Sequence, residues 1–215
     1  MTVTDNSGGA ETVVNTPPAQ DESLIHALIA RCLDGDQTAF GALYEAAAPG
    51  VYRLAYSILL HPQDAEDVVQ ETLVYAFRNL RNFDPARGAF RTWLYTITVS
   101  RCRNARRRKW LPMLRLSSIF GLGLEPSAPE EQAPEAVYAR LSAWETLEKA
   151  LQTLSPRLRE AIALRYGQGL TYREMADVLD CPAKTAESRV RLAHEALREA
   201  LAGSEAILLE AYHRL

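Results

Sequence analysis

Several kinds of functional centre lack support in this sequence of 215 residues. Its three cysteines, Cys32, Cys102 and Cys181, are odd in number and far apart, so they indicate neither a disulfide framework nor a zinc site built on paired cysteines. There is no glycine-rich phosphate loop, and the four histidines lie apart without a recognisable nucleophile. We therefore expect no metal, no cofactor and no enzymatic activity.

Long apolar runs are also missing. Nowhere do about 18 uninterrupted apolar residues occur, which a helix needs to span a bilayer. Residues 1–22 lack the basic start and apolar stretch of a secretory signal, and their polar, breaker-rich composition favours a disordered tail. The chain is expected to be soluble and cytoplasmic.

Charge is distributed unevenly along the chain. The net charge of -3 conceals a stretch, residues 87–109, that holds eight of the 24 basic residues and no acid. By contrast, residues 125–135 hold four acids and no base. A segregated basic stretch is a candidate for contact with nucleic acid even though the whole chain is slightly acidic.

Apolar residues recur at helical spacing from Ser23 onward. The first helix is predicted to end near Gly35, and Asp36 is placed to cap a second one. Pro49 and Pro62 each suit the first turn of a helix, where a missing N–H is tolerated, which predicts further helices of about 12 and 18 residues. Ser155 as a cap and Pro156 at the first position predict the start of another helix later in the chain. No alternating strand pattern competes with these helices.

Proline and glycine divide the rest of the chain. Pro85 and Gly88 mark a loop, and an amphipathic helix is predicted over residues 89–109. The stretch after it has the composition of a linker. We expect an all-α protein with two small helical domains joined by a flexible linker: a tail (1–22), a first domain (23–109), the linker (110–134), a second domain (135–203) and a C-terminal extension (204–215).

A helix-turn-helix is predicted in the second domain. Thr171 and Glu174 form a capping box, in which each side chain satisfies a free backbone N–H at a helix start. This short helix ends before Asp180, and a longer one starts at Pro182 after a three-residue turn, as in DNA-binding proteins. Asp180 suits such a turn, because Asp tolerates the left-handed conformation. A solvated amphipathic helix would look similar, so the motif alone favours DNA only modestly.

The second of these helices has an apolar stripe and an opposite polar face. The polar face suits a major groove, where arginine reads guanine and hydroxyl groups bind phosphates. Its residues are Lys184, Thr185, Ser188, Arg189 and Arg191.

The helix predicted over residues 89–109 is a second candidate for contact with nucleic acid. A run of cations that could neutralise several phosphates lies at its end: Arg101, Arg103, Arg106, Arg107, Arg108 and Lys109. Ahead of the run, aromatics alternate with cations, as stacking of unpaired bases on a positive surface requires: Phe83, Arg87, Arg91, Trp93 and Tyr95. For Trp93 a place in the core is the preferred interpretation, whereas Tyr95 is expected to be more open.

Acidic and polar residues gather at the start of the helix that Pro62 begins. They are Asp64, Asp67, Gln70 and Glu71. Acidic residues in the first turn interact favourably with the helix dipole in any protein, and this explains Asp64. The remainder, beside an otherwise basic domain, predict a basic protein partner.

Three segments together carry a family resemblance: DAEDVVQETLVYAFRNL, FDPARGAFRTWLYTI and LSPRLREAIALRYGQGLTYREMADVLDCPAKTAESRVRLAHEAL. In this order and at this distance they resemble sigma factors of the extracytoplasmic-function class, over most of residues 23–201. The resemblance implies an alternative sigma factor that binds core RNA polymerase and directs promoter-specific initiation and DNA melting, often in a stress response. Implied partners are the polymerase clamp helices and flap, promoter DNA both duplex and single-stranded, and an anti-sigma factor.

The resemblance also implies which residues meet each partner. Those implied to bind polymerase are Asp64, Asp67, Gln70 and Glu71. Those implied to bind the minus-ten element are Phe83, Arg87, Arg91, Tyr95, Arg101, Arg103, Arg106, Arg107, Arg108 and Lys109. Those implied to bind the minus-thirty-five element are Thr171, Arg173, Lys184, Thr185, Ser188, Arg189 and Arg191.

Some positions depart from the family pattern. Glu187 and Leu192 stand where many relatives carry basic residues, and Thr96, Val99 and Ser100 likewise replace positions that are often Arg, Arg and Asn. An alternative is therefore a sigma mimic that binds an anti-sigma factor as a decoy without promoter activity. A conventional operator-binding regulator ranks below both, because it leaves the first domain without a role. The sequence indicates neither the inducing signal nor the promoter.

Overall fold

The computed structural model describes residues 19–110 and 134–204. The first of these ranges forms the first domain. Its helices are α1 (Ala19–Leu33), α2 (Gln37–Leu59), α3 (Pro62–Arg78) and α4 (Phe90–Trp110), with short 3-10 turns at Leu80–Asn82 and Pro85–Arg87 between the last two. α1 begins at Ala19, before the predicted start at Ser23.

The second range forms the second domain. Its elements are α5 (Pro134–Thr153), α6 (Pro156–Ile162), a π-helical turn (Ala163–Gly167), α7 (Tyr172–Leu179) and α8 (Ala183–Ala200). The described residues contain no strand, which confirms the all-α, two-domain prediction. None of their helices is long and apolar enough to cross a membrane. Most of the tail, most of the linker and most of the C-terminal extension lie outside the described residues.

Asp36 begins α2 as predicted. Its carboxylate accepts hydrogen bonds from the backbone N–H groups of Thr38 and Ala39, and Arg31 donates to it from α1 over 2.6 Å. The hydroxyl of Thr38 and then the guanidinium of Arg31 hold the pKa of Asp36 well below its ordinary value. One side chain thus ends the turn between α1 and α2 and fixes the start of the longest helix.

Pro49 lies inside a helix rather than at the start of one, so the prediction of a helix beginning there is wrong. Leu43 before the proline and Leu54 after it are both fully buried, and they lie eleven residues apart, close to three full helical turns. The same face of α2 therefore packs inward on both sides of Pro49. Burying this continuous face outweighs the lost backbone hydrogen bond and steric strain, which cost about 3 kcal/mol.

Pro62 and Pro156 occupy the first turns of α3 and α6, as predicted. His61 caps α3, because its ring nitrogen accepts from the backbone N–H of Asp64. Ser155 stands at the cap position of α6, but its hydroxyl makes no capping hydrogen bond, which corrects the expected role of its side chain. Arg159 instead binds the carbonyl oxygens of Leu151, Gln152 and Leu154 at the end of α5 and so joins α5 to α6.

Two clusters of buried side chains hold the chain together. The first-domain core lies between α1, α2, α3 and α4: Leu28, Ile29, Cys32, Ala39, Leu43, Val51, Val69, Leu73, Ala76, Leu80, Phe90, Leu94 and Ile97. The other cluster, the shared core, contains residues of both domains. From the first domain it takes Leu54, Ala55, Ile58, Ala65, Val68, Tyr95, Val99 and Cys102. From the second it takes Ala161, Ala163, Leu164, Leu170, Met175, Val178, Leu179, Ala186 and Val190.

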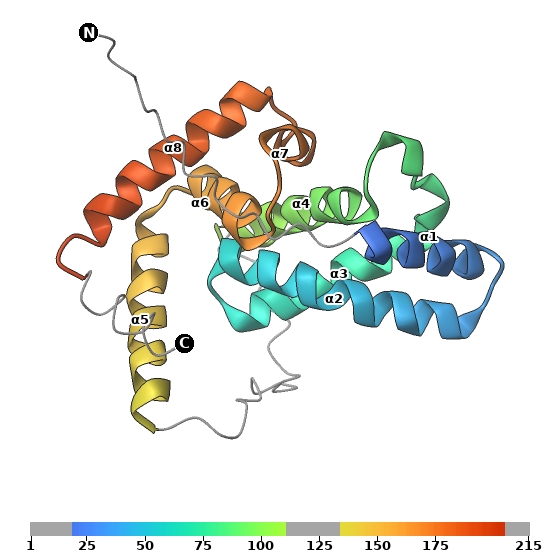
Figure 1. The fold of residues 1–215 in the computed structure, drawn as a ribbon, viewed down its shortest axis with the longest axis horizontal. Helices are drawn as coiled ribbons and strands as arrows, with labels where there is room; N and C mark the ends of the chain where they lie inside the picture. The colour runs from blue at the N-terminus through green and yellow to red at the C-terminus, as the bar shows by residue number, and fades with distance from the viewer. Residues whose placement is uncertain (1–18, 111–133, 205–215) are drawn as a thin grey trace, which may run out of the picture.

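The shared core makes α4 the central element of the structure. Figure 1 shows α4 with α2 and α3 on one side and with α6 and α7 on the other, and α4 contacts α2, α3 and α7. The second domain therefore does not stand apart from the first but packs along the basic helix. This arrangement decides which of the predicted nucleic-acid residues are open to solvent.

Replacing Leu43 with alanine should lower the free energy of unfolding by about 2–5 kcal/mol, because the deleted atoms leave a cavity in the first-domain core. Leu43 is fully buried, whereas Leu24 on α1 is 61% exposed. Leu24→Ala is thus the matched control and should change stability by no more than about 0.5 kcal/mol. Chemical denaturation followed by circular dichroism measures both, and equal midpoints for the two variants would contradict this placement of Leu43.

Candidate nucleic-acid interface

The helix-turn-helix has the predicted local structure. Thr171 Oγ1 accepts from the backbone N–H of Glu174 over 3.3 Å, while the Glu174 carboxylate accepts from the backbone N–H of Thr171 over 2.7 Å. At the end of α7, Asp180 adopts the left-handed conformation with φ 52° and ψ 60°. This conformation is rare for residues other than glycine, and Asp and Asn tolerate it best. The turn therefore sets α8 at a fixed position after α7.

The predicted DNA-reading face of α8 is open to solvent. Ala186, Val190 and Ala193 are buried on the opposite face. Among the predicted residues of this site, the exposed ones are Thr171, Arg173, Lys184, Ser188 and Arg191, and the half-buried ones are Thr185 and Arg189. The structure thus brings these seven residues together over α7 and the first half of α8.

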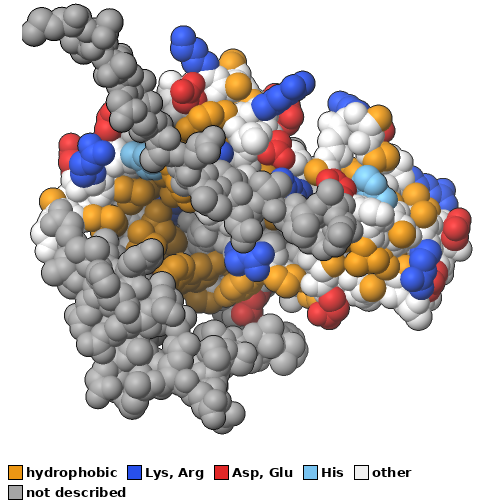
Figure 2. Space-filling view, viewed as in Figure 1, with side chains coloured by type: hydrophobic (Ala, Val, Ile, Leu, Met, Phe, Trp, Pro, Cys, Tyr) orange, Lys and Arg blue, Asp and Glu red, His pale blue; other side chains and the backbone are white. Residues whose placement is uncertain are grey.

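Two contacts hold arginines of this face. Arg191 is paired with Glu195 over 2.6 Å, one helical turn further along, and Arg189 lies 3.8 Å from the sulfur of Cys181. Glu187 and Leu192, the two departures from the family pattern that lie on α8, are exposed as well. Figure 2 shows Lys and Arg side chains projecting from the edge formed by α7, the start of α8 and the loop after α3, with acidic side chains between them.

The predicted polymerase-binding residues line α3. Asp67 and Gln70 are exposed, whereas Asp64 and Glu71 are half-buried. Asp64 lies 3.5 Å from the ring of His61, and Glu71 is paired with Arg108 of α4 over 2.9 Å. We call these four residues the α3 patch; its two exposed members leave it accessible to a partner.

The loop between α3 and α4 is anchored by an aromatic cluster. Phe83 packs edge-on against Phe90, with ring centroids 5.3 Å apart, and lies 5.6 Å from the ring of Trp93. Trp93 is half-buried against the first-domain core, as preferred from the sequence. Arg87, at the tip of the loop, is exposed. An open cleft of about 730 Å³ separates this loop from α1 and α7.

Tyr95 is buried, so the expectation that it is open was wrong. It is 8% exposed, and its hydroxyl donates to Gln168 of the second domain over 2.7 Å. Gly50 of α2 makes room for it, because a Cβ atom at that position would stand 3.0 Å from the tyrosine hydroxyl oxygen. Burial raises the pKa of Tyr95. Its contact with the second domain is what removes it from solvent.

Glu160 of α6 is fully buried and pairs with two arginines of α4. Arg103 donates to both of its carboxylate oxygens, with a shortest distance of 2.8 Å, and Arg106 donates to one of them over 2.8 Å. The hydrogen bond from Arg103 to Glu160 raises the pKa of that guanidinium. A buried carboxylate needs such partners, because an unpaired charge away from water is strongly destabilising.

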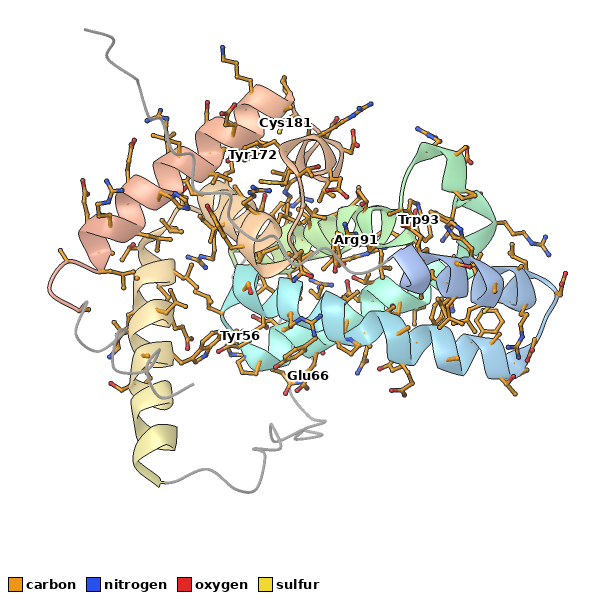
Figure 3. The ribbon with its side chains drawn as sticks, viewed as in Figure 1. Tyr56, Glu66, Arg91, Trp93, Tyr172 and Cys181 are labelled. Atoms are coloured by element: carbon orange, nitrogen blue, oxygen red, sulfur yellow. The ribbon has the colours of Figure 1, made fainter. Side chains whose placement is uncertain are left out.

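A third contact between the domains lies nearer the start of α4. Arg91 donates to Glu174 over 3.2 Å. Burial by itself would raise the pKa of Glu174, but the hydrogen bonds from Thr171 and the charge of Arg91 hold that pKa below its ordinary value. Figure 3 locates Arg91 on α4, and Tyr172 and Cys181 in the helix-turn-helix.

The remaining cations of α4 contact only the first domain in the described part of the chain. Arg101 lies over the ring of Tyr75 at 4.9 Å, Arg107 donates to Asn104, and Arg108 binds Glu71. The side chain of Lys109 is outside the described residues. The predicted minus-ten residues thus fall into two groups. Arg91, Tyr95, Arg103 and Arg106 contact the second domain, whereas Phe83, Arg101, Arg107 and Arg108 contact residues of the first.

Sequence reasoning missed the residues of the second domain that meet α4. Glu160, Gln168 and Glu174 were not predicted to bind anything across the domain boundary. The same holds for Glu148, which accepts from Tyr56 over 3.4 Å beside the stacked ring of Trp144. One signal was present: Glu160 lies one helical turn before the buried Leu164, so an acid stands beside the apolar stripe of its helix.

Comparisons with known protein families agree with this division. A family model of Sigma-70 region 2 matches residues 43–111, and a family model of Sigma-70, region 4 matches residues 144–197. The chain is similar to the RNA polymerase sigma-H factor of Pseudomonas aeruginosa, with 33% identity over 189 residues, 85% of this chain and 94% of that protein. It is also similar to the ECF RNA polymerase sigma factor SigE of Mycolicibacterium smegmatis, with 35% identity over 174 residues, 78% of this chain and 65% of that protein.

Solved structures show the same likeness. One is CnrH in complex with the cytosolic domain of CnrY, with 29% identity, a TM-score of 0.57, and coverage of 82% of this chain and 96% of that one. Another is the sigma factor RpoE of Bartonella quintana in complex with the anti-sigma factor NepR, with 26% identity and a TM-score of 0.59. It covers 76% of this chain and 97% of that one.

Cys102 of α4 should react with iodoacetamide far more slowly than Cys181. Burial raises the pKa of Cys102 to about 12. Near pH 8 it therefore holds about a thousandfold less thiolate than an ordinary thiol, because each pKa unit is a factor of ten. Its reactivity should rise as the pH approaches 12. Mass spectrometry of alkylated peptides measures both residues in one sample, and equal rates would contradict the burial of Cys102.

Proposed function

The chain belongs to the extracytoplasmic-function class of sigma factors, and from this premise we propose which of its surfaces meets each partner. A protein of this class is a transcription initiation factor rather than an enzyme. It binds core RNA polymerase and directs transcription from particular promoters. Its place of action is then the cytoplasm, where bacterial polymerase transcribes.

The α3 patch is the proposed surface for the polymerase clamp helices. Asp67 and Gln70 are exposed side by side on α3, one helical turn apart, and the neighbouring Glu71 already binds a cation, Arg108. An exposed carboxylate beside the amide oxygen of a glutamine suits a partner with basic side chains. The patch lies on the first domain away from the helices of the second domain that contact α4.

The loop before α4 and the cations of α4 are the proposed surface for the minus-ten element. Arg87 and Arg107 are exposed, and Phe83 and Trp93 offer aromatic rings beside them. Cations together with aromatic rings bind single-stranded DNA, because phosphates meet the former and unpaired bases stack on the latter. The face of α4 that carries Arg91, Tyr95, Arg103 and Arg106 completes this surface once the second domain has moved away.

The open face of α7 and α8 is the proposed surface for the minus-thirty-five element. The single observation that carries the proposed function is that this face and the α3 patch occur on one chain, each exposed. A decoy needs only to bind an anti-sigma factor, so a decoy function would not explain why the DNA-reading face is exposed. Because RpoE was solved with an anti-sigma factor, we propose an anti-sigma factor as a further partner here.

Transcript mapping tests the proposed function. The purified chain is added to bacterial core polymerase with fragmented DNA of the source genome, and transcript start sites are compared with and without it. New starts that share two upstream motifs are expected, and an Arg191→Ala variant should alter the upstream one. A chain that produces no new starts would contradict the proposal, and the decoy would then take its place.

Replacing Arg107 and Arg108 with alanine should weaken binding of promoter DNA and flatten its salt dependence. Each phosphate contact contributes about 0.7–0.9 to the slope of log K against log salt, so two lost contacts should reduce that slope by about 1.4–1.8. Fluorescence anisotropy of the polymerase complex at several salt concentrations measures it. Arg198→Ala, an exposed arginine near the end of α8, is the control. An unchanged slope in the double variant would rule out phosphate contact here.

Reversing the charge of Asp67 should weaken binding to core polymerase by about tenfold, a loss of about 1.4 kcal/mol. The variant Asp67→Lys places a cation where a basic partner is proposed, and like charges in contact repel. Asp34→Lys is the control, because Asp34 is exposed at the far end of α1. Surface plasmon resonance with immobilised core polymerase measures both, and equal affinities would remove the α3 patch from the interface.

A further inference from the structure

We propose that Glu187 of α8 reads one base of the minus-thirty-five element, because its carboxylate can accept a hydrogen bond from the 4-amino group of a cytosine. The proposal rests on the proposed function, since Glu187 can read a base only if the open face of α7 and α8 meets DNA. It adds to this face an acceptor for one particular base, beside the cations and hydroxyl groups already proposed there.

Glu187 is exposed within the half of α8 that is proposed to enter the major groove. It follows Lys184 by three residues and precedes Arg191 by four, which places the three side chains on one side of the helix. All three are exposed, whereas Ala186 and Val190 beside them are buried. The carboxylate is therefore flanked by two cations on a surface that would meet the edges of base pairs.

The ordinary roles of a surface acid do not account for Glu187. The favourable interaction with the helix dipole is confined to the first turn, which in α8 contains no acid, and Glu187 lies beyond it. A glutamate can also pair with an arginine four residues later, but Arg191 pairs with Glu195 instead, over 2.6 Å. Within residues 19–110 and 134–204, Glu187 makes no ion pair and no side-chain hydrogen bond. Its carboxylate is thus available to a ligand.

A carboxylate on this face needs a hydrogen-bond donor when DNA is bound. Phosphates repel it, and a charge that loses its water without gaining a hydrogen bond is strongly destabilising. In the major groove, the edges of base pairs offer two kinds of amino donor, N6 of adenine and N4 of cytosine. Glu187 is therefore best satisfied beside one of these two bases.

The atoms next to each amino group favour cytosine over adenine. The amino group of adenine has an acceptor on each side, its own N7 and O4 of the paired thymine, whereas the amino group of cytosine has one, O6 of the paired guanine. Acceptors repel a carboxylate oxygen, so the carboxylate meets less repulsion at cytosine.

The same geometry predicts where this cytosine lies. Arginine reads guanine, and Arg191 is one helical turn from Glu187. Residues one turn apart on a helix in the major groove reach neighbouring base pairs. The cytosine that Glu187 reads should thus lie within about two base pairs of a guanine read by Arg191.

Exchange of the side chain tests the assignment. The full chain is combined with core RNA polymerase, and initiation is measured on promoters in which each base pair of the upstream motif is replaced in turn by the other base pairs. The unmodified chain should prefer cytosine at one position by about tenfold. Glu187→Ala should abolish that preference and no other. Glu187→Gln should shift it to adenine, because glutamine accepts from N6 and donates to N7.

Glu199→Gln is the matched control, because Glu199 is an exposed glutamate about three turns further along α8. It should leave every preference unchanged. Retention of all preferences by Glu187→Ala would overturn the proposal. A rise in initiation of the same size on every promoter would also overturn it, because Glu187 would then only repel phosphates. Circular dichroism checks that each variant is folded, as expected for substitutions at exposed helical positions.

A modified base tests the hydrogen bond itself. N4-methylcytosine keeps its pair with guanine but carries a methyl group in place of the free N–H. At the position assigned to Glu187 it should lower initiation by the unmodified chain about tenfold and leave initiation by Glu187→Ala unchanged. Equal losses for the two proteins would show that Glu187 does not accept from this amino group, and the proposal would then be wrong.

The two failures are distinguishable. If the unmodified chain produces no transcript starts with core polymerase, the proposed function fails, and the reading by Glu187 fails with it. If the unmodified chain initiates and Glu187→Ala keeps every base preference, the proposed function stands and the reading by Glu187 does not.

Discussion

The rest of the structure depends on one buried carboxylate. Glu160 has no exposed surface and holds two guanidinium groups of another domain. Such a pair adds little net stability over apolar side chains, but removing one partner costs about 3–5 kcal/mol because the other charge stays buried and unpaired. The ion pairs of Glu160 therefore fix the position of α6 relative to α4, because α6 cannot lie elsewhere on α4 without leaving this charge unpaired.

The apolar contacts around Glu160 explain why the domains meet at all. Each domain is small, and small domains bury too little surface to have a large stability margin. Leu164, Met175 and Val178 gain burial against Val99 and Cys102 of α4 in the shared core. The helix that provides this packing surface, α4, is also the most basic of the described helices. Val99 is fully buried in the shared core, so this position of α4 serves packing between the domains.

Features that depend on residues close in the sequence were predicted, whereas features that depend on distant residues were missed. The caps at Asp36 and Thr171, the prolines that begin α3 and α6, and the left-handed turn at Asp180 depend on neighbours within about four residues, and all were predicted. The continuous α2 through Pro49 was missed, because it depends on a core formed by other helices. The burial of Tyr95 and the partners of Glu160 were missed for the same reason: the ion pair joins residues 57 positions apart. The DNA and polymerase contacts of the predicted site residues remain predictions.

The packing of the second domain along α4, held by the ion pairs of Glu160 and the shared core, predicts a fixed arrangement of the two domains in the free protein. Spin labels at Leu24→Cys on α1 and Glu199→Cys on α8, both exposed, allow the distance between the domains to be measured by pulsed electron resonance. One narrow distance distribution is expected in the free protein. A broad distribution would contradict the packing of the second domain on α4.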